Sequence, residues 1–135
     1  MKIAVVEYAG ELATRMIHER SSSVVVTDAP PDNMGRGSAF SPTDLVAAGL
    51  AACMTTVLAI KMKQGRFPPL KLRTEVQKVM SAVPPRKIAR IVLDVFVEGP
   101  LSVQDRPEFE ATAHSCPVAL SLSPEIEIEA RFHYD

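Results

Sequence analysis

The stretch Ser41–Lys63, SPTDLVAAGLAACMTTVLAIKMK, constrains the fold more than any other part of the sequence. Ser41 can cap a helix, because its side-chain oxygen can accept a hydrogen bond from an unpaired backbone N–H of the first turn. Pro42 suits the first helical position, where its missing N–H costs nothing. From Leu45 to Ile60 there is no charge, and apolar or small residues fall on every face. Since a helix that is apolar all round is buried all round, the sequence predicts a central helix that the rest of the chain wraps.

The overall composition is that of a soluble globular protein. The chain has 135 residues, of which 47% are hydrophobic and 23% charged, enough for one domain with a core. A net charge of −1 gives no electrostatic case for nucleic acid or an anionic membrane. The apolar part of the central helix is shorter than the roughly 20 residues that span a bilayer, and the N-terminal apolar run is too short for a signal peptide. We therefore expect a single cytoplasmic domain, residues 1–135, without nucleic-acid or membrane partners.

Strands and helices are predicted in separate runs along the chain. Alternating or β-branched stretches predict strands, and capping signals predict two short helices after the last hairpin. The predicted strands are Met1–Tyr8, Leu12–Glu19, Val24–Val26, Leu70–Val83, Lys87–Val97 and Ile126–Tyr134, and the predicted short helices start near Ser102 and Cys116. This segregation indicates an α+β fold with antiparallel sheets. A second subunit would provide the cover that one small sheet does not give the central helix, so we expect a homodimer.

The two cysteines are the first candidates for chemistry. Cys53 lies in the middle of the central helix, where a lone buried Cys is usually an inert small hydrophobe. Cys116 lies in Ser-Cys-Pro at a predicted helix start, where unpaired N–H groups and the helix dipole favour a thiolate. Neither belongs to a CxxC pair, and no zinc signature is present. If the fold brings the two thiols within disulfide reach, one can be oxidised and the other can resolve it, but the sequence alone does not decide whether they meet.

Two motifs carry a resemblance to a known family. The first is Ser-Pro-x-acid-Leu followed by an Ala/Gly-rich helix and a Cys, and the second is a distant Cys-Pro-Val; the residues are Ser41, Pro42, Asp44, Leu45 and Cys53, then Cys116, Pro117 and Val118. Together they resemble the OsmC/Ohr family, the osmotically inducible and organic-hydroperoxide-resistance proteins, and the order of elements matches over essentially the whole chain. The resemblance implies an intertwined α+β homodimer, with antiparallel sheets wrapped around buried central helices and two active sites at the subunit interface.

The resemblance also implies an activity, that of a thiol-dependent peroxidase that protects against oxidative stress by reducing organic hydroperoxides. Cys53 would be the peroxidatic thiolate, which attacks the peroxide and becomes a sulfenic acid. Cys116 would condense with it to a disulfide. An external dithiol, in relatives often a lipoylated protein, would reduce that disulfide. No metal and no organic cofactor are implied.

A mid-helix Cys needs a nearby cation to ionise at neutral pH, and Arg is suited because it stays charged. Arg36, in the Pro- and Gly-containing loop Asp28–Phe40 just before the helix, is the best placed, and Arg15 is the fallback. An Arg in such a loop is otherwise simply solvated.

The acid that would orient this Arg is less clear. The peroxidase branches of the family pair the Arg with a Glu, and the matching position here is Thr43. Asp44 is the next residue, but one helical step is a turn of about 100°, so the two side chains face different ways. Asp44 is therefore either a site acid or only a first-turn partner of the helix dipole. This departure places the chain nearer the less characterised OsmC-like branches.

Three functional readings stay open at this point. The first is the Cys-based peroxidase. The second is a non-catalytic dimer that binds a small apolar ligand at the subunit interface, which the missing Glu favours. The third is a stable dimer whose cysteines only contribute to packing.

Overall fold

The computed structural model describes all residues 1–135, which form two compact units, Met1–Val46 and Ala47–Asp135. The first unit holds a three-stranded sheet, a loop and the first turn of the central helix. The second holds the rest of that helix, a second three-stranded sheet and two short helices. The single domain over residues 1–135 stays a prediction.

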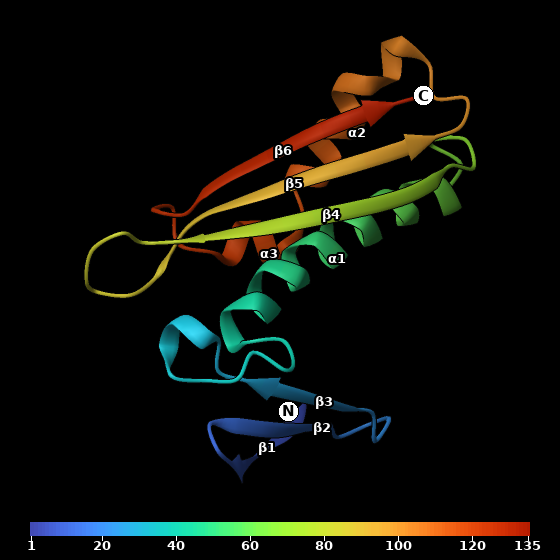
Figure 1. The fold of residues 1–135 in the computed structure, drawn as a ribbon. Coiled ribbons are helices and arrows are strands. Elements are labelled where there is room, and N and C mark those ends of the chain that lie inside the picture. Colours follow the sequence, from blue (N-terminus) through green and yellow to red (C-terminus); the bar gives the residue numbers. More distant parts are fainter. The chain divides into compact units, whose positions relative to one another are not determined.

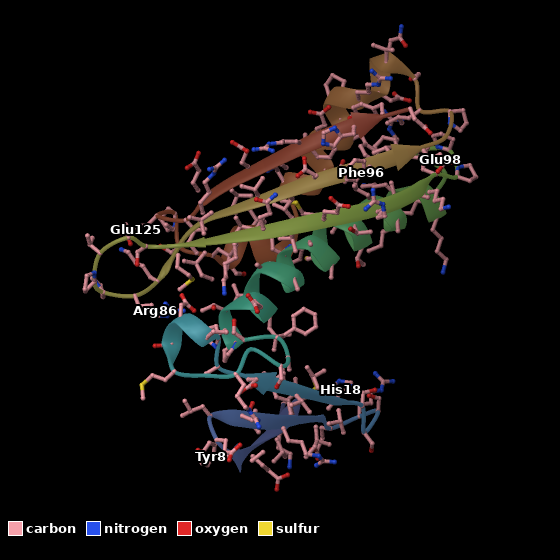
Figure 2. The ribbon with its side chains drawn as sticks, in the orientation of Figure 1. Tyr8, His18, Arg86, Phe96, Glu98 and Glu125 are labelled. Carbon is pink, nitrogen blue, oxygen red and sulfur yellow. The ribbon has the colours of Figure 1, made fainter.

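The first sheet is the antiparallel meander that the sequence predicts. Its strands are β1 (Ala4–Gly10), β2 (Ala13–His18) and β3 (Val24–Asp28), in the order β1-β2-β3. Large apolar side chains are exposed on both faces of this sheet; they include Val5, Val6, Tyr8, Val24, Val25 and Val26. Tyr8, labelled in Figure 2, is 70% exposed. This sheet therefore leaves much of its apolar surface uncovered.

The central helix α1 (Pro42–Lys63) begins and ends where the sequence predicts, to within one residue. The 3-10 turn η1 (Pro31–Asn33) lies in the loop that precedes it. Lys61 and Lys63 lie in the last helical turn, where positive charge suits the helix dipole.

The second sheet differs from the prediction in one strand direction. Its strands are β4 (Lys71–Met80), β5 (Ile88–Glu98) and β6 (Glu127–Tyr134), in the order β4-β5-β6 (Figure 1). β4 and β5 are antiparallel, as expected, but β6 runs parallel to β5. A parallel pair needs a long crossover, and the chain supplies one through η2 (Val103–Asp105), α2 (Arg106–His114) and α3 (Pro117–Ser121).

The core lies between one face of this sheet and the helices. β5 contributes Ile91, Leu93 and Val95, which are 1% exposed or less. Opposite them lie the buried residues of α1, which all fall on one side of the helix: Ala47, Leu50, Ala51, Met54 and Leu58. Ala52, Thr56 and Ile60 on the other side are exposed. The expectation that α1 is buried all round is therefore not met within one chain, because one three-stranded sheet covers only one side of a helix.

By length and composition alone, α1 is apolar enough to cross a membrane, contrary to the sequence-based expectation that its apolar part is too short. The core helix of a globular protein passes the same test. Five residues of α1 are buried in the core of this chain, which accounts for the apolar character of that side of the helix.

Phe109 on α2 is the aromatic centre of this core, and its removal tests the packing. Its ring packs edge to face on the Phe67 ring, with 5.2 Å between the ring centroids, and lies near the rings of Phe132 and Tyr134. We expect Phe109→Ala to lower the free energy of unfolding by about 3–5 kcal/mol, the usual cost of emptying a buried Phe site. Leu120→Ala is the control, because Leu120 is 74% exposed and should change stability little. Urea unfolding of the two variants provides the measurement; equal effects would contradict this description of the core.

Candidate functional site

The second unit brings the two cysteines together. Cys53 lies in the middle of α1, and Cys116 is the residue directly before α3. Both thiols are free, and Cys53 lies close enough to Cys116 to raise the pKa of the Cys116 thiol. The fold therefore makes neighbours of two thiols that are remote in sequence, which the sequence alone could not decide.

Cys116 is the more enclosed of the pair. It is fully buried and belongs to the core that includes Phe109 and Ala113. As predicted for a helix start, its Sγ accepts a hydrogen bond from the backbone N–H of Ala119, at 3.3 Å. The expected thiolate does not follow, however. Burial raises the pKa of the Cys116 thiol, and the adjacent Cys53 adds to the rise, while the N–H groups of Ala119 and Val118 lower it by less. The effect of burial on this pKa is larger than that of the α3 N-terminus, because α3 has only five residues.

Cys53 is half-buried, and it lies at the border between the packed and the exposed sides of α1. The main influences on its neighbour Cys116 are burial, two backbone N–H groups and Cys53 itself, and no charged side chain is among them. Cys116 belongs to the apolar core of this unit, and Cys53 packs against that core.

Asp44 acts at the start of α1. Its Oδ2 accepts from the backbone N–H of Ser41 at 2.9 Å, and its own backbone N–H donates to Ser41 Oγ at 3.0 Å. This is the reciprocal arrangement of a capping box, which pairs donors that a helix start leaves open. Of the two interpretations of Asp44, these bonds account for a first-turn partner. Its participation in a reaction stays a prediction.

Both candidate arginines lie in the first unit and form ion pairs there. Arg36 Nη1 is 3.0 Å from Glu11 Oε2, and Arg36 Nε is 3.6 Å from Asp28 Oδ2. Arg15 Nη1 is 3.6 Å from Glu7 Oε1, with both side chains at least half exposed. Arg36 thus has two acidic partners, one of them buried, which makes it the better held of the two cations.

Sequence reasoning did not identify Glu11 and Asp28, the partners of Arg36. Asp28 had a weak signal, since an Asp that follows a β-branched strand and precedes a Pro-rich loop often hydrogen-bonds the loop backbone. Glu11 had none, because its approach to Arg36 depends on how the β1–β2 turn folds over the loop.

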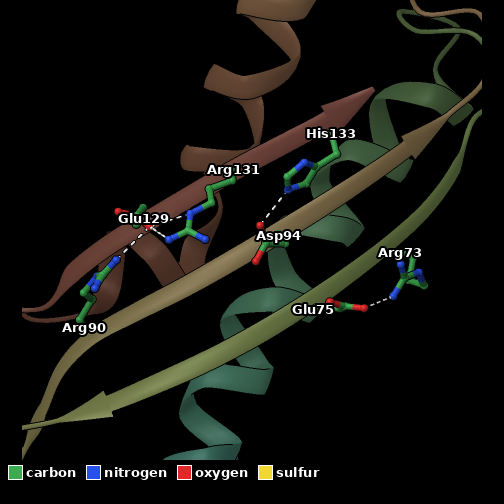
Figure 3. A network of polar contacts seen from close by, with 7 residues as sticks. All are labelled: Arg73, Glu75, Arg90, Asp94, Glu129, Arg131 and His133. Atoms are coloured by element: carbon green, nitrogen blue, oxygen red, sulfur yellow. Dashed lines mark hydrogen bonds and ion pairs between the residues drawn. The ribbon is translucent and has the colours of Figure 1, made fainter. Parts of the chain in front are cut away.

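A second group of polar side chains covers the outer face of the second sheet (Figure 3). Glu129 Oε2 accepts from Arg90 at 3.0 Å and from Arg131 at 2.8 Å, and these bonds lower the pKa of Glu129. His133 Nε2 lies 2.8 Å from Asp94 Oδ1, and Arg73 pairs with Glu75. The Arg90–Glu129 and His133–Asp94 pairs join β5 and β6, whereas Glu129–Arg131 and Arg73–Glu75 each lie within one strand, as expected for the solvent-exposed face of a sheet.

An open hollow of about 350 Å³ lies at one end of this outer face. Its floor includes Phe96, which stacks between the His133 ring at 4.7 Å and the Arg73 guanidinium at 4.3 Å. Phe96 and Glu98, both labelled in Figure 2, lie toward the same end of the sheet. The hollow contains neither cysteine, so it is separate from the thiol pair.

Comparison with known proteins identifies the family of this chain. The family described as OsmC-like protein matches residues 35–131, which include both cysteine motifs. The chain belongs to the OsmC family. This confirms the resemblance drawn from the two motifs. A comparison with curated protein sequences gave no match.

Solved structures of OsmC and Ohr proteins share the fold. A protein from Psychrobacter arcticus 273-4, provisionally named an osmotic stress induced and detoxification response protein, is 38% identical, with a TM-score of 0.89 over 98% of this chain and 96% of that one. The organic hydroperoxide resistance protein OhrB of Bacillus subtilis is 21% identical, with a TM-score of 0.71 over 96% of each chain. An organic hydroperoxide resistance protein OsmC from Legionella pneumophila is 18% identical, with a TM-score of 0.74 over 98% of each chain. The α+β OsmC-like fold is thus confirmed.

The enclosure of Cys116 makes stability depend on pH. Because the pKa of the folded thiol lies above the usual 9.0, the unfolded chain loses this proton first as the pH rises. The contribution to stability is complete below about pH 9 and is lost as the pH rises through the folded pKa. We expect the unfolding free energy of the reduced protein to fall more steeply between pH 8.5 and 10.5 in the wild type than in Cys116→Ser. Urea titrations with a phosphine reductant test this; parallel curves would contradict it.

Proposed function

We propose that this OsmC family protein is a thiol-dependent peroxidase that reduces organic hydroperoxides. The observation that carries the proposal is the proximity of Cys53 and Cys116, two free thiols on remote segments, of which Cys116 is in the core and Cys53 packs against it and raises the Cys116 pKa. Two neighbouring thiols can alternate between dithiol and disulfide. Because the disulfide can be reduced again, the protein can turn over more than once.

The two steps balance without a metal or an organic cofactor. In the first, the Cys53 thiolate attacks one oxygen of the hydroperoxide, the O–O bond breaks, and the alcohol leaves after taking up a proton. Cys53 is then a sulfenic acid. In the second, the Cys116 sulfur displaces the hydroxyl from this sulfenic acid, which forms the disulfide and releases water. An external dithiol returns both sulfurs to thiols by disulfide exchange, and we propose a lipoylated protein as its source.

The environments of the two sulfurs favour this division of roles. Cys53 is half-buried and is the more accessible of the two sulfurs. Cys116 is fully buried, and its raised pKa keeps it a thiol at neutral pH. A protonated, enclosed sulfur beside a more accessible one is suited to resolve a sulfenic acid rather than to start the reaction.

Arg36 is our candidate for the cation that the Cys53 thiolate requires. Cys116 lies in the apolar core of residues 47–135 and Cys53 packs against it, an environment in which a thiolate needs a permanently charged group nearby. Arg36 comes from the loop that precedes α1 and is held by two carboxylates. Arg15 is the fallback, and Asp44 acts through the start of α1. We place the reaction in the cytoplasm, where thiol reductants are present.

We further propose that the active form is an intertwined homodimer. Within one chain, α1 exposes Ala52, Thr56 and Ile60, and the first sheet exposes apolar side chains on both faces. Apolar surface on this scale is usually covered by another subunit. A second subunit that covers α1 would also exclude water from the region around the two cysteines.

A non-catalytic function is the second candidate. The apolar environment of the thiols and the absence of a charged influence on Cys116 also suit a cavity that binds a small apolar ligand at the dimer interface. In this case the cysteines only line the cavity.

Single replacements of the cysteines test the peroxidase. We expect the wild type to consume cumene hydroperoxide with a dithiol reductant, and Cys53→Ser to reduce the rate to that of the reductant alone, because no other thiolate is available. Cys116→Ser should stop after one turnover and accumulate a sulfenic acid that a dimedone probe labels at Cys53. Mass spectrometry of the labelled protein provides the measurement.

The same variants distinguish the second candidate. If both cysteines react no faster than in the urea-unfolded chain, the peroxidase proposal is wrong. A fatty acid that raises the melting temperature of the double Cys→Ser variant as much as that of the wild type would then support ligand binding.

A charge on the exposed side of α1 tests the dimer. Ala52→Glu places a carboxylate where we propose that a second subunit packs, and burying an unpaired charge is costly. We expect the wild type to elute at twice the chain mass of 14.7 kDa and Ala52→Glu to shift to the monomer. Gln77→Glu, on the exposed face of β4, is the matched control and should stay a dimer. Light scattering after size exclusion reads the mass, and a dimeric Ala52→Glu would exclude this interface.

A further inference from the structure

Arg36 is held from two directions by residues of different elements. Its Nη1 donates to Glu11 Oε2 at 3.0 Å, and its Nε lies 3.6 Å from Asp28 Oδ2. Glu11 belongs to the turn between β1 and β2, and Asp28 is the last residue of β3. The Arg36 side chain is 58% exposed, and without partners its guanidinium would sample many rotamers. The two carboxylates restrain it.

Asp28 is the fixed part of this arrangement. Its side chain is 1% exposed, and Oδ2 accepts from the backbone N–H of Ser38 at 3.1 Å and from the Ser38 hydroxyl. These bonds, with Arg36, lower the pKa of Asp28, so the carboxylate is ionised at neutral pH. The Asp28 backbone N–H also donates to Phe40 O at 3.0 Å, which ties the end of β3 to the end of the loop that carries Arg36.

The second oxygen of this carboxylate has an unused capacity. Asp28 Oδ1 is buried and has no hydrogen-bond partner. An unpaired buried acceptor is costly, and its presence usually has a functional or structural reason. A guanidinium presents two parallel N–H groups that match the two oxygens of a carboxylate. Arg36, already beside Oδ2, is the group that can use Oδ1.

The turn that carries Glu11 is held in an unfavourable conformation. Glu11 and Leu12 are the two residues between the paired Gly10 and Ala13, and their φ values are 52° and 65°. Left-handed backbone of this kind is costly for residues other than Gly, Asn and Asp, and it persists only where the surroundings impose it. Leu12 O accepts from the Ala29 N–H at 3.1 Å, so this turn is fixed to the beginning of the Arg36 loop.

We infer that Glu11 and Asp28 are positioning residues, which together fix the Arg36 guanidinium for its action on the Cys53 thiolate. The inference rests on the proposed function, in which Arg36 supplies that cation. A positioning role and a purely electrostatic role predict opposite changes in the thiolate fraction of Cys53. By charge alone, two carboxylates disfavour a nearby thiolate, and neutralising one of them would increase the thiolate fraction. If the carboxylates act by positioning Arg36, neutralising Asp28 lowers the thiolate fraction instead.

The test measures the reactivity of Cys53 alone, in a Cys116→Ser background. Iodoacetamide labelling is followed from pH 5 to 10 for Asp28→Asn, Glu11→Gln, Arg36→Gln and the Asp28→Asn/Arg36→Gln double variant. We expect Asp28→Asn to lower the rate at pH 7 by about 10- to 100-fold, the usual effect of misplacing a catalytic group, and to shift the profile to higher pH. The double variant should react like Arg36→Gln alone, since Asp28 acts only through Arg36. Glu19→Gln, which removes an exposed carboxylate paired with Lys2, is the matched control and should change nothing.

Three results would overturn the inference: a faster reaction of Asp28→Asn, additive losses from Asp28→Asn and Arg36→Gln, or no effect of Arg36→Gln. Should Asp28→Asn fail to fold, Glu11→Gln decides, because its side chain is 77% exposed. An Arg36-dependent loss in Glu11→Gln supports the inference, and an unchanged rate overturns it. The proposed function is tested separately, by Cys53-dependent hydroperoxide consumption in the wild type. If that activity is absent, the proposed function is wrong, and the labelling rates still decide whether Glu11 and Asp28 position Arg36.

Discussion

The packing of one side of α1 against the sheet β4-β5-β6 is the interaction on which the rest of the second unit depends. It buries Leu50, Met54 and Leu58 and thereby fixes the rotation of the helix about its axis. That rotation directs Cys53 to the border of the core, where α3 presents Cys116. The thiol pair is thus a consequence of core packing, and rotation of α1 by one residue would separate the two sulfurs.

The same one-sided packing leaves the other half of α1 apolar and exposed, and the first sheet has exposed apolar side chains of its own. A chain of this length could have placed polar residues there. Instead the sequence retains Ala, Val and Ile at these positions, at a cost in solubility for the lone chain. The proposed dimer and the proposed apolar reaction site therefore depend on the same surface, so assembly and chemistry would be acquired together.

Local signals in the sequence predicted most of the elements. The Ser41-Pro42 start, the Gly-Pro breaks and the β-branched runs placed α1 and all six strands to within a few residues, because caps, breakers and alternation act locally. The direction of β6 was wrong, since strand direction depends on how a crossover returns and not on the strand's own residues. The pKa of Cys116 departs from the expectation for a related reason: the helix start is visible in Ser-Cys-Pro, but the burial that raises the pKa of the thiol depends on packing in the core, which has no local signal. The contact of Arg36 with Glu11 and Asp28 also required tertiary structure.

The sulfur of Cys116 is also the cap of α3, where it accepts the Ala119 N–H in the place usually taken by an oxygen. A sulfur that enters a new covalent bond gives up electron density and changes direction, so it becomes a poorer acceptor. The oxidation state of this atom would then be sensed by the backbone of the first turn of α3. Oxidation of Cys116 would thus weaken the cap of α3, the helix that precedes β6.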